Sequence, residues 1–244
     1  MIKKVFENFL FSFTFVFKRR ESFSNILIFS TKLFQDYFKN YSLRFLLMVQ
    51  NMVKKVVGLT GSIASGKKLV KEALMKKYTA YYSSLSALIM EEAIKKRGLP
   101  VNKETKGAFA TEMRERYGGE VLARVAWNFL NKDKELIIID DIKNPSEIEF
   151  LKRASGGNFV LIGVDAPVEK RWKHVEEAHA RGAASLKDPK TMEDFLKLDA
   201  AELMSGGPHG LHVNQCIAMA DHVIVNDGTI EDFKKKIAEV VDKI

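Results

Sequence analysis

The sequence predicts an α/β fold in which a five-stranded parallel sheet is flanked by helices. From Val53 onward, short apolar runs rich in β-branched residues alternate with amphipathic stretches, the pattern of β-α-β units around a parallel sheet. A glycine-rich segment, Gly61 to Lys67, stands between the first apolar run and the first amphipathic stretch, where it marks a strand-to-helix turn. With 244 residues, the chain is long enough for one such domain and an extension.

The apolar runs predict the strands, and the later ones are almost continuously apolar, as strands buried on both faces should be. The predicted strands are 55–59, 80–83, 136–140, 159–164 and 222–225. The predicted helices are 67–77, 86–96, 103–117, 120–131, 145–154, 168–180, 191–204 and 229–244. Start signals support two of them: Asn144 precedes Pro145 with Glu147 close behind, and Thr229 precedes two acidic residues.

The segment Gly61 to Lys67 reads Gly-Ser-Ile-Ala-Ser-Gly-Lys, the spacing of a phosphate loop. Its glycines let backbone N–H groups wrap a phosphate, the helix N-terminus adds positive dipole, and Lys67 can reach the β and γ phosphates. Chance glycines at a turn are the alternative. The predicted ATP-binding residues are Gly61, Ser62, Ile63, Ala64, Ser65, Gly66, Lys67 and Lys68. Lys68 stands where the full motif has a Ser or Thr that ligates Mg²⁺, so the metal is held otherwise or catalysis is weakened.

Polar residues follow the predicted strands, and the carboxyl ends of parallel strands meet at one edge of a sheet. This places Thr60, Ser84, Asp140, Asp165 and Asn226 around one crevice. A strand-end carboxylate can hold Mg²⁺, so Asp140 is the predicted metal ligand and Asp141 a weaker candidate. A pair of Asp residues after a strand is also ordinary turn chemistry.

Arginines are the expected donors to a phosphoryl group in transfer. Arg171 and Arg181 are ten residues apart, and we predict that they clamp phosphates from a mobile lid. Arg114 and Arg116 belong to the helical insertion between the second and third strands, where a second substrate could bind. Helix spacing turns them to different faces, so only one, Arg114 by preference, should point inward. Each arginine singly is also compatible with a solvated surface.

Asn226, Asp227 and Gly228 form a turn after the last strand. The turn is either a plain helix start or a backbone wall for a nucleobase, in which Asn226 and Gly228 would border the base.

Residues 1–51 form an extension unlike the domain at 52–244. Residues 1–50 hold 11 of the 17 Phe, no Gly, Ala, Pro, Cys or His, and a net charge of +5. Three interpretations compete: a membrane-associating or targeting segment, an organellar presequence, and a start-site artefact with Met52 as the natural initiator. Residue types with AT-rich codons dominate this segment, which favours the third interpretation. If the extension is translated, we expect it to be poorly ordered.

The remaining residues carry a net charge of only +3 and show no basic run with interleaved aromatic residues, so a nucleic-acid role is not predicted. The single Cys216 argues for a reducing compartment, hence the cytoplasm, and is predicted to be a small buried apolar residue. The five His residues lack metal-site spacing and are interpreted as surface or loop residues. Membrane association depends on whether the extension is made, and the oligomeric state is left open.

With its phosphate loop, the strand ending at Asp140, Val164-Asp165-Ala166-Pro167, the two lid arginines and the closing segment 220–228, the chain resembles P-loop kinases of small nucleotides. It is most similar to the dephospho-CoA kinase and nucleoside monophosphate kinase-like group. The resemblance implies transfer of the ATP γ-phosphoryl group with Mg²⁺ to dephospho-CoA or a nucleoside monophosphate. It also implies that the loop through Lys67 cradles the phosphates, that Asp140 lies near the metal and that Arg171 and Arg181 clamp the phosphates. We therefore predict Lys67, Asp140, Arg171 and Arg181 as catalytic residues, and from their places in the chain Arg114 and Ser84 as contacts to the acceptor.

The chain departs from that group at several positions. Lys68 and Leu69 replace the hydroxyl after the loop lysine, Ala87 and Met90 replace an acid and an Arg, and the second strand ends in Ser residues instead of an Asp. These departures favour an alternative function, a nucleotide-binding regulatory protein with weak catalysis.

Overall fold

The computed structural model describes residues 55–85, 88–101, 103–131, 133–183, 189–203, 207 and 210–244. The three interpretations of residues 1–51, the first two residues of the predicted helix 86–96 and the last residue of the predicted helix 191–204 lie outside these residues.

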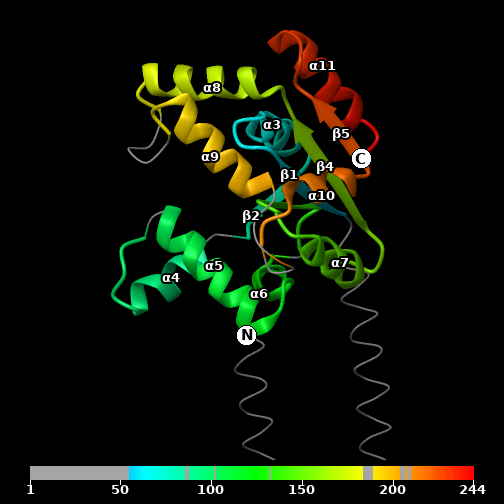
Figure 1. Ribbon diagram of the computed structural model, residues 1–244. Coiled ribbons are helices and arrows are strands. Elements are labelled where there is room, and N and C mark those ends of the chain that lie inside the picture. The colour runs from blue at the N-terminus through cyan, green and yellow to red at the C-terminus, as the bar shows by residue number, and fades with distance from the viewer. Residues whose placement is uncertain are drawn as a thin grey trace, which may run out of the picture. The chain divides into compact units, whose positions relative to one another are not determined.

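In the described part of the chain, one parallel sheet contains five strands in the order β2-β3-β1-β4-β5 (Figure 1). These are β1 (Val56–Gly61), β2 (Ala80–Ser84), β3 (Leu136–Asp140), β4 (Phe159–Asp165) and β5 (His222–Val225). The predicted fold class is confirmed. β1 runs two residues beyond its predicted end because Thr60 and Gly61 continue the pairing with Gly163 and Val164 of β4.

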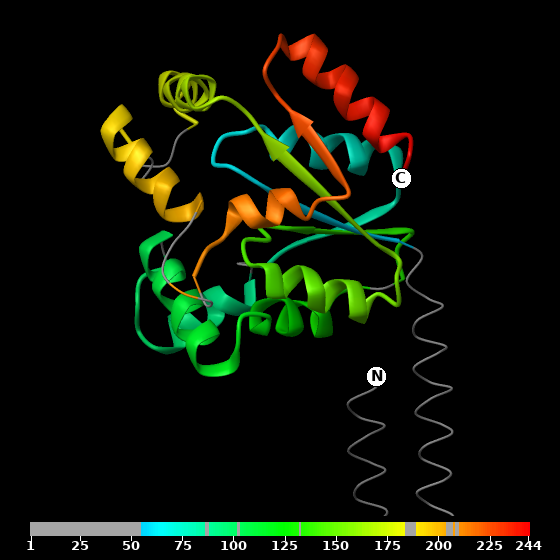
Figure 2. The ribbon, with the colours of Figure 1, turned by 45° about the vertical axis from the view of Figure 1, so that its right-hand side comes forward.

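Helices connect the strands and cover both faces of the sheet (Figure 2). They are α3 (Lys67–Lys77), α4 (Leu88–Lys96), α5 (Lys103–Tyr117), α6 (Val121–Phe129), α7 (Pro145–Ala154), α8 (Val168–Ala180), α9 (Met192–Leu203), α10 (Val213–Ala218) and α11 (Ile230–Val241). None of these described helices has the length and apolar character to cross a membrane.

Alternate residues of the central strand serve two apolar cores, because successive side chains of a strand point to opposite faces. Val57 and Leu59 pack with α3 and α11, whereas Val56 packs with residues of α6, α7 and α10. The second core includes Cys216 on α10, which confirms the prediction of a small buried residue. Its burial raises the pKa of the Cys216 thiol to about 12.

Two helix starts form as their sequence signals predict. The Asn144 side chain accepts a hydrogen bond from the Ser146 amide, and the Glu147 side chain accepts one from the Asn144 amide. Thr229 and Asp232 form the same reciprocal cap on α11. The helix α10 was not predicted, because six residues are too few to show helical periodicity.

Gly58, in the middle of β1, is required by close packing. A Cβ atom there would lie 2.6 Å from Phe159 and 2.7 Å from Ile142, both buried. We predict that Gly58→Ala lowers the free energy of unfolding by about 1–3 kcal/mol, the cost of overpacking a core. Gly107→Ala, in α5 with nothing within 4 Å of the new atom, is the matched control and should be neutral or stabilising by up to about 1 kcal/mol. Urea unfolding of both variants tests this, and equal stabilities would contradict it.

Candidate functional site

The Gly-rich segment forms a tight loop between β1 and the N-terminus of α3. Gly61 has φ of 146°, and a Cβ atom there would lie 2.0 Å from the carbonyl oxygen of Val164. Gly66 caps α3 with φ of 110°. Both positions lie in backbone conformations that favour glycine. The loop therefore has the strand-to-helix geometry that a phosphate loop requires.

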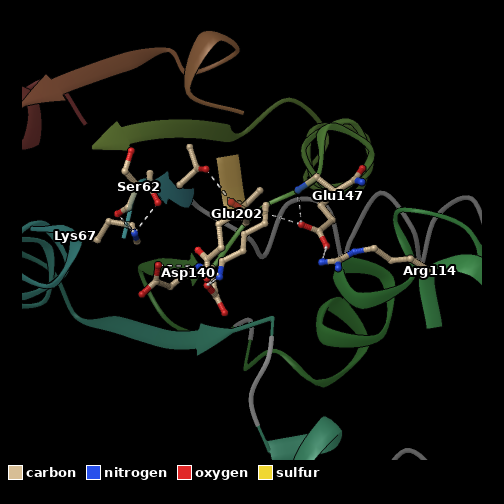
Figure 3. Close-up of polar contacts among 12 residues, drawn as sticks. Ser62, Lys67, Arg114, Asp140, Glu147 and Glu202 are labelled. Atoms are coloured by element: carbon tan, nitrogen blue, oxygen red, sulfur yellow. Dashed lines mark hydrogen bonds and ion pairs between the residues drawn. The ribbon is translucent and has the colours of Figure 1, made fainter. Parts of the chain in front are cut away.

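Lys67 folds back over this loop (Figure 3). Its Nζ atom donates hydrogen bonds to the carbonyl oxygens of Gly61, at 2.7 Å, and Ser62, at 2.8 Å. Burial lowers the pKa of Lys67, and the carboxylates of Asp141 and Asp140 partly oppose that effect. An anionic phosphate would stabilise the charged ammonium further.

Side chains at the carboxyl ends of β4 and β5, Asp165 and the next residue after β5, Asn226, hold the loop against the sheet. The Ser62 hydroxyl donates to Asp165 at 2.5 Å, and the Asn226 side-chain amide donates to the Ser65 carbonyl at 3.1 Å. The predicted meeting of strand ends at this edge is thus confirmed for Asp165 and Asn226.

The helix α8 also contacts the loop, which the sequence did not indicate. Arg171 donates to the Ile63 carbonyl at 3.4 Å, and Nδ1 of His174 lies 2.9 Å from the Ala64 carbonyl. His174 was interpreted as a surface or loop residue. In the structure it supports the loop backbone.

Asp140 ends β3 beside Ser84 of β2, with which it is in register. Its carboxylate accepts hydrogen bonds from the Tyr82 hydroxyl at 3.1 Å and from the Asp141 amide at 2.7 Å. Burial, and then the charge of Asp140, raise the pKa of Tyr82 well above its ordinary value. A carboxylate offers about four acceptor positions, so Asp140 keeps capacity for a cation.

Lys143 lies three residues beyond Asp140 and was not among the predicted site residues. Its Nζ atom is 3.2 Å from Asp141 and 3.1 Å from Glu202 on α9. Burial opposes its charge, but these two carboxylates outweigh burial and raise the pKa of Lys143. Lys67 and Lys143 thus both lie under the influence of the Asp141 and Glu202 carboxylates.

Arg114 is not on an open surface where an acceptor would meet it. Its side chain is 4% exposed and its Nη2 atom lies 2.9 Å from Glu147 of α7, whose own side chain is fully buried. The other Glu147 oxygen accepts hydrogen bonds from the backbone amides of Lys143 and Asn144, at 2.9 and 3.1 Å. The prediction that only one of the two arginines points inward is confirmed, since the Arg116 side chain is 63% exposed.

Arg171 and Arg181 do not form one clamp in the described structure. Arg171 is buried, and its two terminal nitrogens bind both oxygens of Asp199 on α9. Its Nε atom donates to the Ala166 carbonyl at 2.9 Å. Arg181 ends α8 with its side chain 67% exposed, and its contact is Glu177 of the same helix at 3.9 Å.

Of the other predicted site residues, Asn226 and Gly228 lie in the turn after β5 and Lys68 lies on the surface. The Lys170 ammonium binds the Asn226 side chain at 2.8 Å and the Gly228 carbonyl, which fixes the turn predicted to border a base. Lys68 points outward, with a side chain 81% exposed and Glu72 at 3.8 Å. The nucleobase role of Asn226 and Gly228 and the acceptor role of Ser84 stay predictions.

Two of the acidic residues that the sequence did not reveal have partners that are distant along the chain. Asp199 and Glu202 are three residues apart on α9 and bind Arg171 and Lys143 respectively. An acidic pair at that spacing on a helix is common. The spacing of Lys143 from Asp140 was the one available signal.

A phosphate loop between the central strand and the next helix, on a parallel sheet of order β2-β3-β1-β4-β5, defines a P-loop protein of the kinase-like class. The sequence comparisons then identify the family. A UPF0200 protein of Thermococcus gammatolerans is 31% identical over 193 residues, covering 78% of this chain and 95% of the relative. One from Saccharolobus islandicus is 30% identical over 197 residues, covering 78% and 94%. The chain belongs to the UPF0200 family, and no family model matches it.

Among solved structures, shikimate kinase from Aquifex aeolicus aligns with a TM-score of 0.44 and 16% identity, covering 77% of this chain and 96% of that one. A putative kinase from Chloroflexus aurantiacus gives 0.47 and 15%, covering 78% and 96%. Likenesses at this level carry no information about the substrate of this chain.

The burial of Arg114 generates a stability prediction. Removing one partner of a buried ion pair leaves an uncompensated charge, so Arg114→Met should lower the free energy of unfolding by about 3–5 kcal/mol. Arg116→Met, two residues along the same helix and exposed, should change it by less than about 0.5 kcal/mol. Chemical unfolding measures both. A free energy of unfolding equal to that of the wild type in Arg114→Met would show that the buried Glu147 carboxylate does not depend on this arginine.

Proposed function

We propose that this protein is an ATP-dependent kinase that transfers the γ-phosphoryl group of ATP to a small nucleotide-type acceptor. The observation that supports this best is the pairing of a glycine-built phosphate loop with Lys67, within the electrostatic reach of the strand-end residue Asp140. Phosphoryl transfer depends on positioning and on cations around the moving group, and this edge supplies both. A lone cysteine in the sequence is consistent with action in the cytoplasm.

The donor set at the strand end fits Mg²⁺. Mg²⁺ is usually held by one or two carboxylates together with substrate phosphates and water, not by an all-protein cage. Among the described residues, no group of three or more His, Cys, Asp or Glu could hold a metal ion. Asp140, with Asp141 adjacent, would hold Mg²⁺ directly or through water, and the metal would offset phosphate charge in the transition state.

The acceptor is proposed to be dephospho-CoA or a nucleoside monophosphate, bound on the side of α4, α5 and α6. These helices are inserted between β2 and β3, so they adjoin the strand ends that carry Ser84 and Asp140. Ser84 would offer a hydroxyl there. Dephospho-CoA is the less supported acceptor, because a carboxylate to receive its hydroxyl proton is lacking at the end of β2.

Lys67 should be required for turnover. A panel of dephospho-CoA and nucleoside monophosphates, assayed for ADP formation with Mg·ATP, should contain at least one acceptor. Lys67→Ala should reduce that turnover by about a hundredfold or more, because the β and γ phosphates lose their cation. Lys76→Ala, exposed on the same helix, should retain it. ATP binding without phosphorylation of any acceptor in the panel would exclude kinase activity on these substrates.

A second candidate, a nucleotide-binding regulator with weak catalysis, is favoured by Lys68. If the missing hydroxyl limits the rate, Lys68→Ser should raise turnover and Lys68→Ala should not, because only the first supplies a metal ligand. Steady-state rates of the two variants distinguish a gained metal ligand from an effect of merely removing the Lys68 side chain, because the latter would raise turnover in both. Wild-type turnover in the usual kinase range of about 1–100 per second would dismiss the regulator.

A further inference from the structure

We propose that Lys143 is a second phosphate-binding cation of this site, that it contacts the terminal phosphoryl group of bound ATP, and that Glu202 occupies it in the nucleotide-free protein. The proposal rests on the proposed function, because it assumes that the loop binds ATP. It adds a residue that neither the phosphate-loop motif nor the predicted arginines include.

The backbone around Lys143 is held from both sides. Its amide donates to the buried Glu147 carboxylate at 2.9 Å, and its carbonyl accepts from the His212 amide at 2.8 Å. Asp141, two residues earlier, has φ of 69°, a left-handed conformation that is costly for a residue other than glycine. This strained turn redirects the chain directly after β3. A fixed backbone with a flexible four-carbon side chain is suited to presenting an ammonium group.

The charges around Lys143 are shared with Lys67. Asp141 and Glu202, the two partners of Lys143, also act electrostatically on Lys67, and so do Asp140 and Lys143 itself. Figure 3 shows Glu202, Asp140 and Lys67 in the same close-up as the Arg114–Glu147 pair. Lys67 and Lys143 therefore share the carboxylates of Asp141 and Glu202. Movement of one carboxylate away from the lysines, or an added cation such as Mg²⁺, would favour entry of a phosphate anion.

Glu202 is the carboxylate best placed to leave. Asp141 belongs to the strained turn at the end of β3, whereas Glu202 reaches Lys143 from another helix. Asp199, one turn earlier on α9, is bound by both terminal nitrogens of Arg171. The helix can thus stay anchored while the Glu202 side chain rotates away. Glu202 would then give up Lys143 to a phosphate oxygen.

The position of Lys143 points to the terminal phosphate. In phosphate loops the backbone encloses the inner phosphates and the lysine reaches the outer two, which is the role we propose for Lys67. Lys143 approaches from the end of β3, past Asp140 and Asp141, and therefore from the side on which the metal and the acceptor would lie. It should distinguish ATP from ADP more than it strengthens nucleotide binding in general.

Isothermal titration with two probes tests this: Mg·ADP and the magnesium complex of the non-hydrolysable β,γ-imido analogue of ATP. Lys143→Met should weaken binding of the triphosphate about tenfold, the usual loss for one charge-assisted hydrogen bond, and should leave Mg·ADP within about twofold. Glu202→Gln should strengthen triphosphate binding several-fold relative to Mg·ADP, because Lys143 then gives up a neutral amide, and not the Glu202 carboxylate, when it binds the phosphate. Lys173→Met, exposed on α8, is the control and should change neither affinity.

The outcomes separate this proposal from the proposed function. If the wild type binds neither probe, the proposed function fails. If it binds both, and Lys143→Met changes the two affinities equally or not at all, the role of Lys143 is overturned while ATP binding stands. Should Lys143→Met not fold, Glu202→Gln decides, since it keeps the lysine. An unchanged ratio of the two affinities in Glu202→Gln would overturn the proposal.

Discussion

The arrangement of the site depends on the parallel pairing of β1 between β3 and β4. This pairing brings the carboxyl ends of three strands to the same edge, in register, at the middle of the sheet. The phosphate loop leaves β1 there, Asp140 ends β3 on one side of it, and Asp165 ends β4 on the other. At Gly61 the backbone leaves no room for a side chain, because an added Cβ atom would lie 2.0 Å from the Val164 carbonyl oxygen. A larger residue at that point would separate the loop from β4 and from the hydroxyl contact that Ser62 makes with Asp165.

The cations of this region are each matched to acceptors in the folded protein, because an unpaired charge in a partly buried place is costly. Lys67 binds loop carbonyls, Lys143 binds two carboxylates, and Arg171 binds Asp199. The difference between them lies in how firmly each is held. Arg171 has both terminal nitrogens engaged and is buried, which suits support of the loop from α8. The ammonium groups of the two lysines have compact, rotatable donors that can change partners without moving the backbone.

Local sequence patterns predicted most of the helices and strands. Of the site, they predicted the residues whose roles depend on spacing along the chain. Strand periodicity, the loop glycines and the Asn144 cap each depend on residues within a few positions of one another, and all three appear in the structure. Arg114 shows where such reasoning stops. Its burial depends on tertiary packing and on the partner Glu147, 33 residues away along the chain, so the sequence alone could not distinguish it from a substrate-facing arginine. The same holds for Glu202, which meets Lys143 through the tertiary packing of α9.

The buried Glu147 carboxylate bears on how the proposed acceptor binding and the proposed nucleotide binding would influence each other. This one buried carboxylate joins the Arg114 side chain of α5 to the backbone amides of Lys143 and Asn144. Glu147 is therefore a direct polar link between α5 and the turn that carries Lys143. If an acceptor favours one position of α5 and a triphosphate favours one position of Lys143, the two ligands act on the same equilibrium. Each would then change the affinity of the other by the same factor, so a single buried acid would make acceptor and nucleotide binding reciprocal.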